Sequence, residues 1–288
     1  MKVLVLGAAG QVGRSLMAKV PADIELLCFD RAGLDIADEV AVRGRVEALR
    51  PDAVINAAAY TAVDKAESDR EQAYAINAHS VGYLAKACAD LGAKLVHIST
   101  DFVFDGIAGR PYEPADVTAP VNAYGASKLA GEKAIMTTVG LRWLILRSAW
   151  IYSGHGHNFL LTMLRLFRER SQVNVVADQV GTPTSSVTLA TCLWKAAADA
   201  GPSAILHFTD AGVASWYDFA VAIYEESSSL GLLSKRVEVV PISSEQYPTA
   251  AKRPSYSVLD KQQTWKRFAL QPVHWREALR EVLRGLGK

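Results

Sequence analysis

The stretch Val3-Leu-Val-Leu-Gly-Ala-Ala-Gly-Gln-Val-Gly13 decides the fold. Its first four residues form the continuous apolar run that is typical of a strand buried on both faces of a parallel sheet. Gly7, Gly10 and Gly13 follow, and an amphipathic segment begins at Ser15. Strand, glycine-rich turn and helix in this order indicate a dinucleotide-binding turn, in which the backbone and the helix N-terminus receive the pyrophosphate. An ordinary tight turn is the alternative, and three glycines at this spacing make it the weaker one.

Further apolar runs downstream alternate with helical patterns, and we predict strands at 24–29, 53–56, 94–98 and 143–146. This alternation predicts an α/β fold with a Rossmann-type doubly wound parallel sheet. Beyond residue 152 the strict alternation loosens. We therefore expect a dinucleotide-binding domain over 1–152 and a smaller, partly interwoven C-terminal substrate lobe over 153–288. Segments at about 171–210 are expected to return to the Rossmann sheet.

Composition and charge exclude several classes of function. Half of the 288 residues are hydrophobic, 21% are charged and the formal net charge is +1. These values indicate a globular protein with no electrostatic case for a nucleic-acid or membrane partner. No apolar run approaches the roughly 18 residues of a membrane span, and the N-terminus enters a strand without a signal peptide's cleavage region. A cytoplasmic location is expected.

Cysteine and histidine usage argues against a metal centre. Cys28, Cys88 and Cys192 lie far apart in apolar patterns, so we expect buried, reduced thiols rather than a disulfide framework. His155 and His157 lack flanking carboxylate or cysteine partners. A flexible polar loop is the better interpretation of this pair, and no metal ligand is predicted.

The second predicted strand ends at Asp30-Arg31, where a dinucleotide's adenosine ribose would lie. An acid here accepts both ribose hydroxyls and repels a 2′-phosphate, whereas Arg31 would attract that phosphate. The turn residues Ala8 and Ala9 provide no cation. The sequence thus favours NADH slightly and leaves NADPH open. Asp35 is a candidate for the adenine edge; a carboxylate at a helix N-terminus is an equally good interpretation.

Tyr124-Gly-Ala-Ser-Lys128 supplies a candidate proton donor. The tyrosine and lysine lie one helical turn apart on one face, and Asn122 is a plausible N-cap. A nearby ammonium is expected to lower the phenol pKa, which is about 10 when free. Alone the pair is a weak signal, because such residues are usually solvated. Thr100, at the carboxyl end of a predicted strand, is placed to hydrogen-bond a substrate oxygen or to cap a loop.

Taken together, these motifs resemble those of the extended short-chain dehydrogenases/reductases that act on nucleotide sugars. More narrowly, they resemble the dTDP-4-dehydrorhamnose reductase family. The matching motifs span most of the chain: Gly7-x-x-Gly10-Gln-Val-Gly13, the stretches at 56–67, 99–106 and 147–150, Tyr124-Gly-x-Ser-Lys128, Asn158-Phe159, the stretch at 178–184, and Arg253-Pro-x-x-Ser257.

The resemblance implies NAD(P)H-dependent reduction of the C4 ketone of dTDP-4-dehydrorhamnose (dTDP-4-dehydro-6-deoxy-L-mannose) to dTDP-L-rhamnose. It implies Tyr124 as proton donor, Lys128 as the residue that tunes it and binds the nicotinamide ribose, and Thr100 as a partner of the reacting oxygen. The implied cofactor contacts are Gly7, Gly10, Gln11, Val12, Gly13, Asp30, Arg31, Asp35, Ile36, Ala59, Tyr60, Thr61, Ile98, Tyr124 and Lys128. The implied substrate contacts are Thr100, Asp101, Phe102, Trp150, Asn158 and Arg253. Trp150 would face the sugar ring; a buried aromatic at a strand end is the alternative.

Departures from related patterns narrow the expectation. Sugar 4,6-dehydratases of this fold place an Asp-Glu pair after the threonine, but this chain has Asp101-Phe102, which argues against water elimination. Some family members bind Mg²⁺ at a dimer interface through an acidic residue where this chain has Ser15, so Mg²⁺ is doubtful and only a possible homodimer is expected. Two alternatives stay open: a non-catalytic dinucleotide-binding regulatory subunit, and a sister nucleotide-sugar reductase or epimerase.

Overall fold

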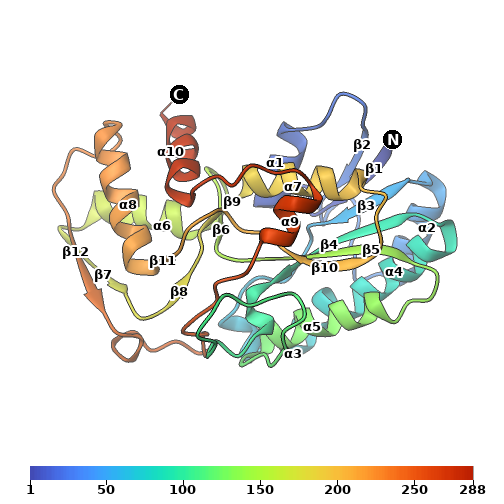
Figure 1. Ribbon diagram of the computed structural model, residues 1–288, viewed down its shortest axis with the longest axis horizontal. Helices are drawn as coiled ribbons and strands as arrows, with labels where there is room; N and C mark the ends of the chain where they lie inside the picture. Colours follow the sequence, from blue (N-terminus) through green and yellow to red (C-terminus); the bar gives the residue numbers. More distant parts are fainter. Residues whose placement is uncertain (288) are drawn as a thin grey trace.

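A six-stranded parallel sheet forms the centre of the computed structural model, which describes residues 1–287 (Figure 1). Its strands, in chain order, are β1 (Lys2–Leu6), β2 (Glu25–Phe29), β3 (Ala53–Asn56), β4 (Lys94–Thr100), β5 (Arg142–Ser148) and β10 (Ala204–His207). They lie side by side in the order β2-β1-β3-β4-β5-β10, so the winding direction reverses between β1 and β3. Ligands of doubly wound sheets bind beyond the strand ends at such a reversal. The predicted Rossmann-type α/β fold is confirmed.

Helices cover both faces of this sheet (Figure 1). One face carries α1 (Gln11–Ala18) and α7 (Ser186–Ala198), and the other carries α2 (Glu39–Leu49), α4 (Ser80–Leu91) and α5 (Ala123–Met136). Successive side chains of a strand point to opposite faces. Val3 and Val5 accordingly pack in the α7 core and Leu4 and Leu6 in the α2–α4 core. This double burial explains why β1 is a continuous apolar run.

Glycine allows the first turn to close on the sheet. Gly7 has φ +81°, and a Cβ there would lie 2.7 Å from the carbonyl carbon of Ala57, just past the end of β3. A Cβ on Gly13 would lie 2.3 Å from the oxygen of Gly7. Any larger side chain would push α1 away from the ends of β1 and β3. The turn is therefore built at the strand reversal.

A smaller lobe lies beside the sheet, on the left in Figure 1. It contains α6 (Phe159–Glu169), β7 (Gln172–Val176), α8 (Trp216–Ser229), β12 (Glu238–Ile242) and α10 (Trp275–Leu286). β7 pairs with β12 outside the main sheet. Between these two strands in sequence, α7 packs on the main sheet and β10 is part of it. The chain thus passes repeatedly between the two parts. The predicted domain boundaries themselves stay a prediction.

Short elements complete the chain. They are η1 (Lys65–Glu67), α3 (Arg70–Tyr74), the π-helical turn η2 (Ala75–His79), η3 (Asp101–Val103), β6 (Ile151–Tyr152), β8 (Val180–Gly181), β9 (Thr184–Ser185), β11 (Ala214–Ser215), η4 (Ser244–Gln246) and α9 (Gln262–Arg267). Cys88 and Cys192 are buried as expected, but the expectation for Cys28 is wrong, since it is exposed on the edge strand β2. Among residues 1–287, no helix has the length and apolar character needed to cross a bilayer.

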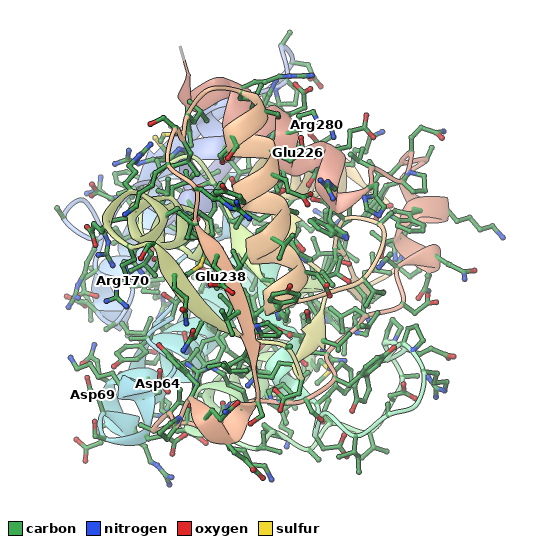
Figure 2. All side chains as sticks on the ribbon, turned by 90° about the vertical axis from the view of Figure 1, so that its left-hand side faces the viewer. Asp64, Asp69, Arg170, Glu226, Glu238 and Arg280 are labelled. Carbon is green, nitrogen blue, oxygen red and sulfur yellow. The ribbon has the colours of Figure 1, made fainter. Side chains whose placement is uncertain are left out.

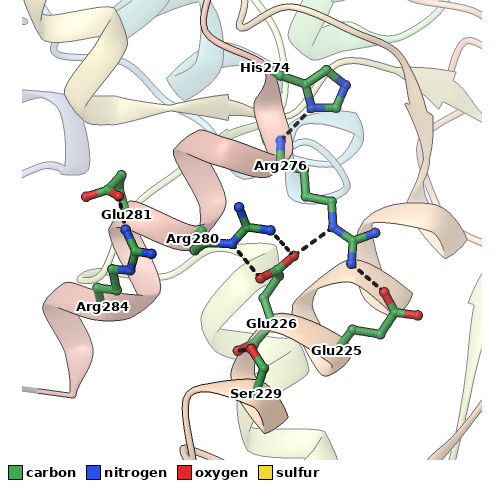
Figure 3. A network of polar contacts seen from close by, with 8 residues as sticks. All are labelled: Glu225, Glu226, Ser229, His274, Arg276, Arg280, Glu281 and Arg284. Carbon is green, nitrogen blue, oxygen red and sulfur yellow. Dashed lines mark hydrogen bonds and ion pairs between the residues drawn. The ribbon is translucent and has the colours of Figure 1, made fainter.

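Glu226 fastens the last helix to the smaller lobe (Figure 3). Its carboxylate accepts from Arg276 Nε at 2.8 Å and from Arg280 Nε and Nη2, both at 2.8 Å. The hydrogen bonds from Arg280, above all, lower the pKa of Glu226 to about 2. The ionised carboxylate therefore joins α10 to α8.

We expect Glu226→Gln to lower the free energy of unfolding at pH 7 by about 1–2 kcal/mol, because both arginines stay partly hydrated. The folded-state pKa is depressed from 4.5, so this contribution is present above pH 4.5 and is lost as pH falls towards 2. Urea titrations at several pH values measure the difference from the wild type. Glu281→Gln, in the exposed pair with Arg284, is the control and should change little. A difference that does not shrink in acid would contradict the assignment.

Candidate active site

Helix α5 carries Tyr124 and Lys128, and its first turn is held firmly. Asn122 is the predicted N-cap: its Oδ1 accepts from the Gly125 amide at 2.8 Å, and its Nδ2 donates to the Lys252 carbonyl at 2.8 Å. A Cβ on Gly125 would lie only 2.1 Å from the Phe102 oxygen. The start of α5 therefore packs directly on the turn that follows β4, which brings Tyr124 to the carboxyl edge of the sheet.

Thr100 and Asp101 lie at the end of β4 beside Tyr124. The Thr100 hydroxyl accepts from the Phe102 amide at 3.2 Å, so its interpretation as a cap is confirmed, and it donates to Asp101 Oδ1 at 3.0 Å. Asp101 is buried, and its Oδ2 has no hydrogen-bond partner among residues 1–287. Burial raises the pKa of Asp101 to about 6. A buried, unpaired carboxyl oxygen at this point is available to a ligand hydroxyl.

The expected tuning of Tyr124 by Lys128 is wrong for this structure. Burial raises the pKa of Tyr124 to about 12; the hydrogen bond with Thr100 opposes this rise and the charge of Asp101 adds to it. Lys128 Nζ donates to the Ile98 carbonyl at 2.7 Å and lies 3.2 Å from His97 Nε2. Burial lowers the pKa of Lys128 to about 8. The helical spacing placed both residues on one face, but it gave no information on where the ammonium turns.

The segment that leaves β3 contains Ala59, Tyr60 and Thr61 and is held by a residue that the sequence did not single out. Asn77, in the π-helical turn, accepts from the Tyr60 amide at 2.9 Å and donates to the Tyr60 carbonyl at 3.0 Å. It also donates to Ser127 Oγ on α5 at 3.0 Å. Asn77 thus fixes a predicted cofactor segment to the helix of Tyr124. A buried amide in an otherwise apolar helical pattern was the available signal.

The predicted adenosine residues lie near the end of β2. Asp30 and Arg31 are exposed, and Asp30 Oδ1 accepts from the Gly33 amide at 3.0 Å. Asp35 accepts from the Ala37 amide at 3.0 Å, and α2 begins only after its N-cap Asp38. The interpretation of Asp35 as a carboxylate at the helix N-terminus is therefore wrong. Ile36 is buried in the core beneath α2 and α4.

Gln11 and Asn158, predicted as cofactor and substrate contacts, bind each other. Asn158 Nδ2 donates to Gln11 Oε1 at 2.8 Å, and Ser153 Oγ donates to the same oxygen at 3.0 Å. Asn158 Oδ1 caps α6 through the Leu161 amide at 3.1 Å. The glycine turn is thus tied to the first helix of the smaller lobe. Val12 is buried against the sheet, so only its backbone faces the turn.

Trp150 has a left-handed backbone, with φ +49°, and its ring stacks on Trp216 with centroids 3.5 Å apart. Such a conformation costs a non-glycine residue free energy and is typical of functional sites. Trp216 and Phe159 line a cavity of about 760 Å³ in the smaller lobe, together with Arg170 and Arg253. Trp150 therefore lies next to the wall of this cavity.

Arg253 connects the cavity to the larger domain. Its guanidinium pairs with Asp64 at 2.7 Å and 3.0 Å, and hydrogen bonding from Arg253 lowers the pKa of that carboxyl. Figure 2 views the molecule from the smaller lobe and shows Arg170 and Asp64 on the same side of the view. Cationic side chains thus line a cavity that also offers aromatic faces, which suits a nucleotide with its phosphates.

Ser15 is buried between two helices. Its hydroxyl is 2.7 Å from that of Ser186 in a buried contact between α1 and α7. Within the described residues, no group of three or more His, Cys, Asp or Glu side chains is placed to hold a metal ion. The expectations that Mg²⁺ is doubtful and that a homodimer is possible are untested by this geometry and stay predictions.

Comparison with known proteins agrees with this geometry. The family model described as RmlD substrate binding domain matches residues 1–287. The dTDP-4-dehydrorhamnose reductases of Burkholderia thailandensis and Escherichia coli are 43% and 39% identical and align over 98–99% of each chain. A crystal structure of the Bacillus anthracis dTDP-4-dehydrorhamnose reductase in complex with NADP superposes with a TM-score of 0.93 at 36% identity, covering 99% of both chains. The chain therefore belongs to the dTDP-4-dehydrorhamnose reductase family of the extended short-chain dehydrogenases/reductases.

Proposed function

We propose that this protein reduces the C4 ketone of dTDP-4-dehydrorhamnose to dTDP-L-rhamnose with a nicotinamide dinucleotide. The observation that carries the proposal is the position of Tyr124 beside Thr100, at the carboxyl end of β4. β4 is the neighbour of β3, and the glycine turn lies at the strand reversal between β3 and β1. Family members bearing this name, and the NADP complex of the Bacillus anthracis relative, support it.

The glycine turn fits a dinucleotide pyrophosphate. The N-cap of α1 is Gly10, which supplies no side-chain hydrogen bond, and the first turn of α1 carries no acidic residue. The free backbone N–H groups and the helix dipole there suit a phosphate. The cofactor supplies the hydride when bound. Lys128, Ala59, Tyr60, Thr61 and Ile98 would lie along its nicotinamide half.

Tyr124 acts as the general acid in this proposal. Its raised pKa keeps the phenol protonated throughout the neutral range, so the proton is in place when the substrate binds. The alkoxide that forms at C4 on hydride transfer is strongly basic and can take this proton from the phenol. Thr100 donates to Asp101 Oδ1 in this structure; turned towards the substrate, its hydroxyl would donate to the same developing oxyanion and stabilise charge where it appears.

The cavity of the smaller lobe holds the nucleotide part of the substrate in this proposal. Its volume of about 760 Å³ suits a ligand of nucleotide size. Trp216 and Phe159 offer ring faces for a base, and Arg170 and Arg253 offer charges for the diphosphate. Trp150, stacked on Trp216 beside this cavity, would contact the sugar together with Asp101 and Phe102.

We propose a modest preference for NADH, because Asp30 would repel a 2′-phosphate. Asp30→Ala should raise the ratio of kcat/KM for NADPH over NADH by about tenfold, the change expected for about 1.4 kcal/mol. Initial rates with both cofactors measure it. Arg31→Ala should move the ratio in the opposite direction. A wild-type preference of a hundredfold for NADPH would overturn the proposal.

The decisive experiment is incubation of the purified protein with NADH and dTDP-4-keto-6-deoxy-L-lyxo-hexose, followed by identification of the sugar. Formation of dTDP-L-rhamnose supports the proposal. A C4 epimer would indicate a sister enzyme instead. No turnover on any keto-sugar, with stable copurification of a larger enzyme, would indicate a regulatory subunit.

A further inference from the structure

A buried row of polar side chains runs behind Tyr124, from β3 through β4 to α5. Asn56 Nδ2 lies 3.2 Å from His97 Nδ1, and His97 Nε2 lies 3.2 Å from Lys128 Nζ. The exposed fractions of these residues are 1%, 0% and 2%. Water therefore cannot relieve a mismatch of donors and acceptors within the row.

The orientation of Asn56 is set by a backbone group. The Ala58 amide donates to Asn56 Oδ1 at 3.1 Å, and a backbone N–H can only donate. Reversing the side-chain amide would place two donors face to face. The NH₂ group of Asn56 therefore points at His97 Nδ1, and that nitrogen must accept.

The acceptor role of Nδ1 decides the tautomer of His97. Burial lowers the pKa of His97 well below its ordinary value, so the ring is neutral and carries its single proton on Nε2. This N–H points at Lys128 Nζ. An ammonium has three donors and no lone pair, whereas a neutral amine can accept.

We propose that Asn56 and His97 hold Lys128 as a neutral amine in the cofactor-free protein, with His97 acting as a positioning residue for the active-site lysine. All three groups are then satisfied: Asn56 donates to His97, His97 donates to Lys128, and Lys128 donates to the Ile98 carbonyl at 2.7 Å. If Lys128 were an ammonium, one contact between two donors would remain for either tautomer of His97. The active-site role of Lys128 rests on the proposed function; the tautomer does not.

The other groups around Lys128 are compatible with this state. Glu132, one turn further along α5, acts to raise the pKa of Lys128, but burial outweighs it and the pKa falls to about 8, so the neutral amine predominates above that pH. The Glu132 carboxylate is already paired with Arg147 of β5 and accepts from Ser99 of β4. Tyr124, on the same helix, is neutral in the physiological range. Arg147 is thus neutralised by its ion pair with Glu132, and its charge has little effect on Lys128.

The tautomer of His97 is directly measurable in the intact chain. The protein, with its six histidines, is labelled with ring-¹⁵N histidine, and the His97 signals are assigned by their loss in His97→Gln. Long-range ¹H–¹⁵N correlation spectra recorded at pH 9, where Lys128 is neutral, should show Nε2 protonated and Nδ1 bare. A proton on Nδ1, or on both nitrogens, would overturn the proposal. No substrate is needed, so inactivity would affect only the proposed function.

Asn56→Asp provides a second test, because it should reverse the donor and acceptor roles of the residues in this row. The new carboxylate can accept from both the Ala58 amide and a protonated Nδ1, which turns Nε2 into an acceptor for a Lys128 ammonium. We expect the tautomer to switch, with Nδ1 protonated and Nε2 bare, because Lys128 then keeps its charge up to a higher pH. The same long-range spectra, recorded at pH 9, measure this switch. An unchanged tautomer would contradict the proposal; if the variant does not fold, the wild-type spectrum decides alone.

Discussion

Tyr124→Phe is expected to reduce kcat with dTDP-4-dehydrorhamnose by about 10²–10⁴-fold, which is the usual contribution of a positioned general acid. The substitution removes only the phenolic oxygen. The ring keeps its edge-on contact with Phe102, at a centroid distance of 5.6 Å, and the capped start of α5 is untouched. NADH binding, followed by fluorescence titration, should therefore stay close to that of the wild type while turnover is lost.

A matched control tests whether the loss of activity is specific to the Tyr124 hydroxyl or follows from removing any tyrosine hydroxyl. Tyr224 lies on α8 in the smaller lobe, and its hydroxyl is 3.5 Å from the Lys235 carbonyl. Tyr224→Phe should keep wild-type kcat and KM. If Tyr124→Phe retained the wild-type rate of NADH oxidation, another group would have to protonate the alkoxide, and the assignment of Tyr124 would fail.

The parts of the fold that sequence predicted well are those governed by local chemistry. The apolar run of β1 and the N-cap at Asn122 each depend on residues only a few positions apart. Glycine spacing predicted the turn because the steric demand at Gly7 and Gly13 admits no other residue. Such features need no knowledge of distant partners.

The parts that sequence missed are pairings between distant segments. Asn77 contacts Ser127, fifty positions away, and Asp64 pairs with Arg253 across 189 positions. Residue pattern alone does not indicate such contacts. The position of the Lys128 ammonium was missed for the same reason, because its partners, His97 and the Ile98 carbonyl, lie on strand β4 and not on α5. Burial then reversed the expected effect on the Tyr124 pKa.

Glu132→Ala is expected to be the most destabilising single change near the site, lowering the free energy of unfolding by about 3–5 kcal/mol. Glu132 and Arg147 are 0% and 2% exposed and share two hydrogen bonds, at 2.7 Å and 2.9 Å. Without the carboxylate, the contacts left to the buried guanidinium among residues 1–287 are the Pro114 carbonyl at 3.3 Å, the neutral ring of His207 and the face of the Phe104 ring, none of which carries a negative charge. Ser99 Oγ also loses its acceptor. Urea denaturation measures the loss.

The cost arises from an uncompensated charge rather than from a lost contact, so removing both charges should restore most of the stability. Glu132→Leu combined with Arg147→Met is expected to recover well over half of what Glu132→Ala loses. Glu169→Ala, in the exposed pair with Arg165, is the control and should cost less than about 0.5 kcal/mol. A double variant as unstable as Glu132→Ala would show that the pair itself, rather than the stranded Arg147, holds α5 against β4 and β5.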